Sequence, residues 1–210
     1  MKNLGKPAGM WALFAGSFEK HLTVEFDLTA GQAKDVAARA KKKYREIIAK
    51  LPEFDKRDRF EMNIVNCAML AAFILCMPQR PDIKTLTDYY AAAMMTPTMK
   101  AFCRASGKKK FTPKDIEGMK ATAKLRAGDR NPYSWNMDFF EYEDGSGYEA
   151  RFTTCGICTL MQVLGLYDLT PALCHLDYTM SDAGGASDFV REYTLASGGP
   201  YCDCGYHKKQ

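Results

Sequence analysis

The sequence has neither a long apolar run nor a strong excess of one charge. Its longest uninterrupted apolar stretch, CAMLAAFILCM from Cys67 to Met77, is well short of the roughly 20 residues that a bilayer-spanning helix needs. The formal net charge is +4 and the pI is near 8.5, below the pI of more than about 9 that is typical of nucleic-acid binders. Membranes, DNA and RNA are therefore not expected partners.

The sequence also has no internal repeat, no low-complexity tract and no convincing cleavage site after the apolar segment AGMWALFAG. A cytoplasmic location is therefore expected, where the eight cysteines would be thiols rather than a disulfide framework. With 210 residues and 47% hydrophobic composition, the chain can bury a substantial core. We expect one compact domain over residues 1–210, and the sequence leaves a homo-oligomer open.

The first 130 residues have the periodicity of helices. Apolar residues spaced four apart predict a first amphipathic helix over about 7–26, with Met10, Phe14, Phe18 and Leu22 on one face. The segment from Arg59 to Met77 is apolar on nearly every side, which predicts a central helix packed by several neighbours. We expect a helical lobe of about five helices over residues 1–130.

After Asn131 and Pro132 the period changes from 3.6 to 2. Apolar residues alternate over Tyr133–Phe139 and Tyr148–Phe152, on either side of the turn-rich EDGSG, which predicts a β-hairpin. Two further strands are expected near the end of the chain, at Phe189–Leu195 and Tyr201–His207. Two helices should separate the hairpin from these strands, the second starting at Thr170 with Pro171 and carrying Cys174. The predicted fold is α+β, with a small antiparallel sheet of about four strands and two inserted helices over 131–210.

The final part of the chain is rich in reactive side chains, since five of the eight cysteines follow residue 154. Cys155 should lie where a strand gives way to a helix, near unpaired backbone N–H groups that lower a thiol pKa. Its thiolate is therefore a candidate nucleophile. Cys158 completes a CGIC motif with the spacing of a redox pair, but the βαβ context of thioredoxins is missing, so simple packing is the alternative.

A second candidate group lies on the following helix. Helical spacing places Cys174, Asp177 and Tyr178 on one face, where they could line a pocket. The alternative is that Asp177 faces water or caps a nearby loop.

Arg191 should share a strand face with Phe189, Tyr193 and Leu195. A buried guanidinium needs an acceptor, because an unpaired buried charge costs several kcal/mol. Asp177 or Asp203 could supply it, and so could the carboxylate of a ligand.

Zinc binding is a further alternative. Cys202 and Cys204 should share one face of the last strand with Asp203 opposite, and His207 follows three residues later. Even together with Cys155, Cys158 and Cys174, this spacing fits no common tetrahedral zinc framework. We therefore expect no metal and no cofactor.

The same stretch resembles the family of L-2-amino-thiazoline-4-carboxylic acid hydrolases. The matching features are a Leu-Gly, a Pro before Cys and Asp, Arg-x-x-Thr-Leu, a glycine, Cys-Asp, and an upstream cysteine; they fall on Leu164, Gly165, Pro171, Cys174, Asp177, Arg191, Thr194, Leu195, Gly198 or Gly199, Cys202, Asp203 and Cys155. Cys204 stands where the family usually has phenylalanine, which puts the identity of the substrate in question. The cysteine and glycine spacing is also somewhat similar to that of small-molecule-binding 4-vinyl reductase domains, which would make the chain a non-catalytic binding or sensor module.

The first resemblance implies hydrolytic opening of a thiazoline ring in a small substrate that bears a carboxylate, with release of a carbamoyl-cysteine product. It implies a thiolate nucleophile at Cys155 or Cys174, proton transfer by Asp177 or Asp203, and a grip on the substrate carboxylate by Arg191. The other residues expected to bind substrate are Thr194, Cys202 and Tyr178. Water could equally be the attacking group, with the cysteines only shaping the pocket.

Overall fold

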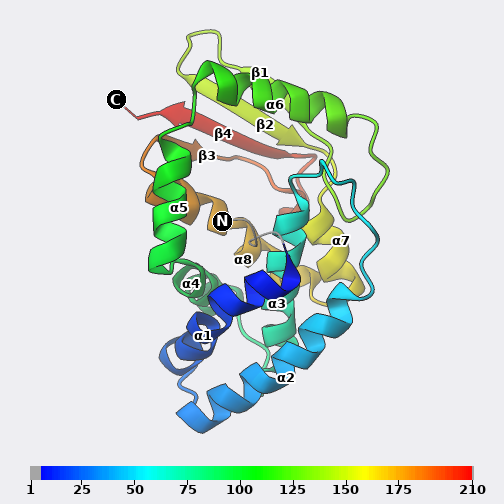
Figure 1. Cartoon of the computed structure of the whole chain (residues 1–210), viewed down its shortest axis with the longest axis vertical. Helices are drawn as coiled ribbons and strands as arrows, with labels where there is room; N and C mark the ends of the chain where they lie inside the picture. Colours follow the sequence, from blue (N-terminus) through cyan, green and yellow to red (C-terminus); the bar gives the residue numbers. More distant parts are fainter. Residues whose placement is uncertain (1–5, 210) are drawn as a thin grey trace.

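A computed structural model describes residues 6–209 of the chain. Within this range six helices precede a four-stranded sheet, and three further helices are inserted between its second and third strands (Figure 1). The helices are α1 (Pro7–Glu25), α2 (Ala30–Ile48), α3 (Glu61–Cys76), α4 (Ile83–Met94), α5 (Pro97–Gly107), α6 (Pro113–Arg126), α7 (Gly156–Val163), α8 (Thr170–Cys174) and α9 (Leu176–Gly184). The strands are β1 (Asp138–Glu141), β2 (Gly147–Phe152), β3 (Ser187–Val190) and β4 (Cys202–Lys208). The predicted α+β class is confirmed, with six N-terminal helices rather than about five.

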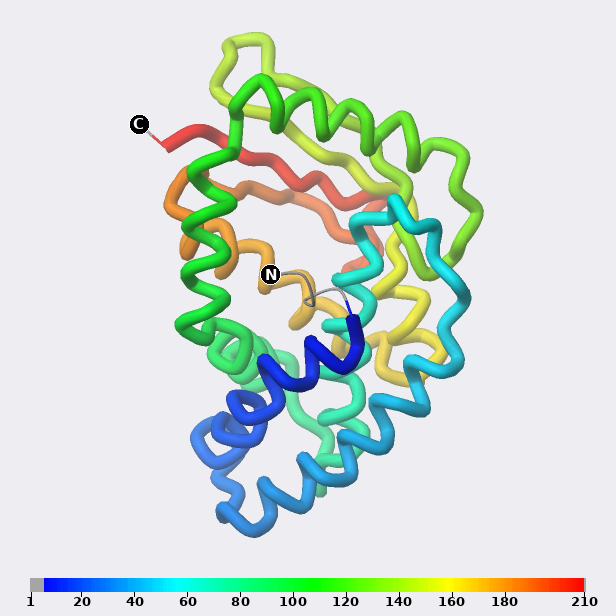
Figure 2. Tube along the Cα trace, in the orientation of Figure 1, coloured from blue at the N-terminus to red at the C-terminus, as the bar shows by residue number. Residues whose placement is uncertain are grey.

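The helical part is built around α3, which has eleven buried residues and lies at the centre of the molecule (Figure 1). The predicted face of α1 is correct: Met10, Phe14, Phe18 and Leu22 are all buried. Figure 2 shows α1 and α2 at the end of the molecule remote from the sheet. None of the helices within residues 6–209 is both long and apolar enough to cross a membrane.

The sheet is antiparallel throughout, with strand order β1-β2-β4-β3. Ala150 of β2 pairs with Cys204 of β4, and both are buried. Ala150 and Cys204 mark the inner face of the sheet. α6 covers the β1–β2 side of this face (Figure 1), and Lys120 of α6 forms an ion pair with Glu141 of β1. The inner face of the sheet is therefore directed toward the helices, and the cysteines of β4 lie on it.

Two strand predictions are wrong in extent. The hairpin begins at Asp138 instead of Tyr133, because Asn136 bonds through its side chain to the backbone N–H groups of Thr153 and Thr154, at 2.9 and 2.8 Å. These side-chain bonds take the place of a strand ladder. The strand predicted over 189–195 ends at Val190, since the next residues turn away from the sheet.

The helix predicted from Thr170 is two short helices. α8 ends at Cys174 and α9 begins at Leu176, so Cys174 and Asp177 belong to different helices. His175 between them keeps near-helical backbone angles, with φ of −67° and ψ of −20°. The junction is a shallow change of direction, and Cys174 and Asp177 still point into the same part of the molecule.

α5 and α9 approach each other through glycines. A Cβ on Gly107 would lie 2.3 Å from the carbonyl oxygen of Gly184, so any side chain there would collide with backbone. This contact brings α9, which carries Asp177, directly against α5.

Candidate active site

The main cavity lies between the helices and the inner face of the sheet, and its volume is about 210 Å³. Its walls come from α1, α3, α4, α5, α7, α8, α9 and β4. Most of the lining is apolar and includes five methionines. The asparagines, cysteines, tyrosines and charged residues on it are Asn63, Asn66, Cys67, Tyr90, Cys155, Cys174, Asp177, Arg191, Cys202, Cys204 and Tyr206. Five of the predicted site residues therefore border one space: Cys155, Cys174, Asp177, Arg191 and Cys202.

Cys155 occupies the N-cap position of α7 in an extended conformation, as predicted from the change of period. The bonds from Asn136 fix the two residues before it. The residue after it must be glycine, because a Cβ on Gly156 would lie 2.1 Å from the carbonyl oxygen of Tyr133. The Cys155 thiol is thus held at the start of the helix from both sides.

The electrostatic environment separates Cys155 from the other cysteines of the cavity. The thiol of Cys158, together with backbone N–H groups at the start of α7, lowers the pKa of Cys155 despite its burial. Hydrogen bonding to Cys155 and burial raise the pKa of Cys158. Burial raises the pKa of Cys174 and raises that of Cys204 to about 12. Among these thiols only Cys155 has a lowered pKa, and all eight cysteines are free.

Arg191 follows β3 directly and does not lie on a strand, so its predicted alignment with Tyr193 and Leu195 is wrong. Its guanidinium forms an ion pair with Asp177, donates to the carbonyl oxygen of Cys174 at 3.1 Å, and lies 4.7 Å from the centre of the Phe189 ring. Of the two internal acceptors expected from the sequence, Asp177 and Asp203, Asp177 is therefore the one that pairs with Arg191. Its Nε is buried and bonds to no residue among those described.

Asp203 is located on the opposite face of β4 and does not line the cavity. Its carboxylate accepts hydrogen bonds from the backbone N–H groups of Glu192 and Tyr193, at 2.9 and 2.7 Å. These bonds end β3 and fix the loop that starts at Arg191. Asp203 therefore acts on the cavity indirectly, by orienting the Arg191 loop.

Thr194 and Tyr178 border a second, more open cavity of about 200 Å³. Cys174 and Arg191 lie between the two cavities and line both. The structure thus divides the predicted site residues into an inner group around Cys155 and an outer pair, Thr194 and Tyr178.

Sequence patterns gave no indication of a buried network beside the cavity. Arg126 is 1% exposed and donates to the carbonyl oxygen of Trp135 at 3.0 Å and to Ser134 Oγ at 2.9 Å. It also forms ion pairs with Asp58, at 3.3 Å, and with Asp129. Because Trp135 lines the cavity and hydrogen-bonds to Cys155, the network supports the wall on which that thiol lies.

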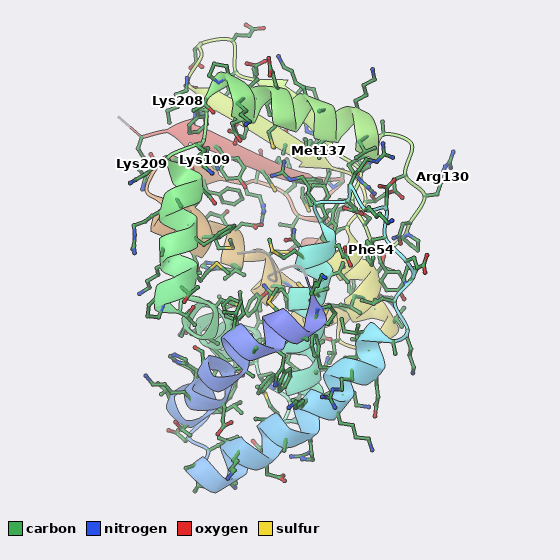
Figure 3. All side chains as sticks on the ribbon, in the orientation of Figure 1. Phe54, Lys109, Arg130, Met137, Lys208 and Lys209 are labelled. Atoms are coloured by element: carbon green, nitrogen blue, oxygen red, sulfur yellow. The ribbon has the colours of Figure 1, made fainter. Side chains whose placement is uncertain are left out.

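A third cavity, of about 350 Å³, adjoins the main one and shares Asp177 and Tyr206 with it. Lys110 lines it with its ammonium 3.2 Å from the centre of the Tyr206 ring, and burial lowers the pKa of this lysine to about 8. Figure 3 shows Lys109, Lys208 and Lys209 together at this corner, where the turn after α5 meets the end of β4. Of these lysines only Lys110 lines the third cavity, together with Arg59, Asp115 and Asp177.

Metal binding has no geometric support in residues 6–209, where no group of three His, Cys, Asp or Glu side chains is placed to hold an ion. Cys202 and Cys204 face the cavity, and His207 instead stacks on Tyr142 with ring centres 4.6 Å apart.

Comparison with curated proteins gave no match, and comparison with solved structures also gave none. A family model described as L-2-amino-thiazoline-4-carboxylic acid hydrolase matches residues 61–206, which is more than half of the 210-residue chain. The match begins at α3 and ends in β4, so it includes nearly every element that lines the main cavity. On this basis the chain belongs to the L-2-amino-thiazoline-4-carboxylic acid hydrolase family.

Proposed function

We propose that this protein hydrolyses a small cyclic amidine that carries a carboxylate, of the 2-amino-thiazoline-4-carboxylate type, in the main cavity. The observation that carries the proposal is the placement of Cys155, whose thiol has a lowered pKa and borders the same cavity as Arg191. A thiolate and a cation on one small cavity suit an electrophilic ring carbon and a carboxylate, respectively. Family membership suggests the same class of reaction.

In the proposed reaction the Cys155 thiolate adds to the amidine carbon, the ring carbon–sulfur bond breaks, and the ring sulfur leaves as a thiol after taking up a proton. Water then adds to the same carbon and Cys155 leaves as a thiolate. One water is consumed and the product is a carbamoyl-cysteine. Asp177 is the better candidate for the proton transfers, because it lines the cavity and Asp203 does not.

Cavity size and charge support a small anionic substrate. About 210 Å³ is less than the roughly 300–1,000 Å³ of pockets for drug-sized ligands, so this cavity by itself suits a compact molecule. Asp177 already neutralises part of the Arg191 guanidinium, and the unmatched Nε–H is the group left for a substrate carboxylate. In this proposal Arg191 would therefore contact the substrate carboxylate through one N–H rather than two.

The direct test is to incubate the protein with 2-amino-thiazoline-4-carboxylate and to follow carbamoyl-cysteine by mass spectrometry and the released thiol with a thiol reagent. Cys155→Ser should reduce kcat by at least about 100-fold, the scale on which a positioned catalytic group contributes. Cys174→Ser is the matched control, since that cysteine borders the same cavity but burial raises its pKa. Its turnover should stay within about threefold of the unaltered protein, less than 1 kcal/mol in the barrier.

Different outcomes separate the alternatives. Turnover in Cys155→Ser close to that of the unaltered protein would contradict the nucleophile assignment and favour direct attack by water. Binding of the thiazoline acid without product would favour a binding or sensor module.

A further inference from the structure

The main cavity has a second unmatched polar atom besides Arg191 Nε. Asn66 lies on α3, whose other residues near it are almost all apolar and buried. Its side-chain oxygen is shielded from solvent and accepts a hydrogen bond from no residue in the described range of 6–209. The residue lines the main cavity.

The helical half of the cavity offers few other polar groups. The Tyr90 hydroxyl and the Cys67 thiol are close enough to shift each other's pKa, so each of these two residues has a polar neighbour. Asn63, one turn earlier on α3, is exposed to solvent. Asn66 is therefore the buried and unsatisfied hydrogen-bonding group that this half of the site presents to a ligand.

Leaving a buried amide oxygen unmatched costs about 1–3 kcal/mol, and most buried polar groups in proteins have a partner. At this position a leucine of similar size would avoid the cost and would suit the apolar helix. The placement of Asn66 is therefore explained by a ligand with an N–H group that reaches α3 while its carboxylate lies near Arg191.

We propose that Asn66 is a specificity-determining residue that accepts a hydrogen bond from the amino group of the amidine. The inference rests on the proposed function, since it assigns a second recognition point in the same cavity. Arg191 from the sheet side would select the carboxylate, and Asn66 from the helical side would select the N–H. A site with both contacts favours a molecule that has an acid and an amino-substituted ring carbon.

The test compares two ligands and three proteins. The ligands are 2-amino-thiazoline-4-carboxylate and thiazoline-4-carboxylate, which lacks the amino group. The proteins are the unaltered chain, Asn66→Leu, which removes the acceptor, and Asn66→Asp, which retains an acceptor oxygen. All three proteins, including the one with Asn66 unaltered, also carry Cys155→Ser, so that slow turnover does not interfere. Dissociation constants are measured by calorimetry, and a thermal melt of each variant verifies folding.

With Asn66 present, the dissociation constant of 2-amino-thiazoline-4-carboxylate should be about 10-fold lower than that of thiazoline-4-carboxylate, as one hydrogen bond to a buried group would give. Asn66→Leu should abolish the preference by weakening binding of the amino compound alone, and Asn66→Asp should keep it. An unchanged preference in Asn66→Leu, or its loss in both variants, would overturn the role of Asn66 but leave the proposed hydrolase function standing. If neither compound binds the unaltered site, both proposals are wrong.

Discussion

Replacing Arg126 by methionine should destabilise the protein more than any surface change. Arg126 and the Asp58 side chain are 1% and 0% exposed and form an ion pair. Without the guanidinium, Asp58 retains only the Ser134 hydroxyl at 2.5 Å and the Phe60 backbone N–H at 2.8 Å. Removing one partner of a buried pair costs about 3–5 kcal/mol. That loss is a large share of the roughly 5–15 kcal/mol by which domains are stable.

Urea unfolding at pH 7, followed by tryptophan fluorescence, would measure this loss. With a slope of about 2 kcal/mol per molar urea, the midpoint should fall by about 2 M. The double variant Arg126→Met/Asp58→Leu should lose clearly less than the sum of the two single variants, because the fully buried Asp58 charge is then absent and only the partly exposed Asp129 loses its partner. The matched control is Arg57→Met, which breaks an exposed pair with Asp55 and should leave the urea midpoint nearly unchanged.

Two results would refute the reasoning. A loss below about 1 kcal/mol in Arg126→Met would mean that the Asp58 carboxylate does not depend on the guanidinium for its stability in the interior. Strict additivity in the double variant would mean that the two charges do not depend on each other. The prediction also has a functional side. Since Arg126 holds the carbonyl group of Trp135, which neighbours Cys155, Arg126→Met should raise the pKa of that thiol toward its ordinary value.

Three further predictions follow from single residues. Alkylation of Cys155 by iodoacetamide, mapped by mass spectrometry, should reach half its maximal rate at a pH below the ordinary thiol pKa of about 8.5, because the pKa of Cys155 is lowered. A midpoint at or above about pH 8.5 would contradict the stabilisation of the thiolate by Cys158 and the backbone N–H groups of α7. Burial lowers the pKa of Lys110 from 10.5 to about 8. Between about pH 8 and pH 10.5 this lysine is therefore more protonated in the unfolded chain than in the folded one, so the free energy of unfolding rises with pH in that range. Lys110→Met should therefore raise the unfolding free energy at pH 7 by about 1–2 kcal/mol, and the gain over the unaltered protein should shrink as pH rises above 8; a pH-independent gain would contradict this. Gly156→Ala should destabilise the fold by more than about 1 kcal/mol in urea and slow the alkylation of Cys155, since its Cβ would meet the Tyr133 carbonyl; unchanged values would show that the backbone yields there.

Local patterns were sufficient where each residue interacts with its sequence neighbours. The four-residue spacing of Met10 and Phe14 identified the buried face of α1, and the alternation around Cys204 identified the inner face of β4. The position of Cys155 at the start of a helix also follows from a local change of period. These features depend on backbone geometry that a short window of sequence specifies.

Features that depend on distant partners could not be found in this way. Tyr133 begins no strand because Asn136 bonds to residues 17 and 18 positions later, and β3 ends early because Asp203 binds the backbone of the loop after it. Nothing in the residues around Arg126, at the end of α6, signals its burial, although it is among the most buried side chains. Asn66 was hidden in an apolar helix, where the only signal was a pair of amides, Asn63 and Asn66, among hydrophobic residues.

The glycine contact between α5 and α9 has a consequence for motion. Gly107 and Gly184 leave no side-chain atoms between the two backbones, so little can adjust there when the helices move relative to each other. The cavity walls that contain Phe102 of α5 and Asp177 of α9 should therefore behave as one rigid body. Admission of a ligand then depends on displacement of cavity walls other than these two helices.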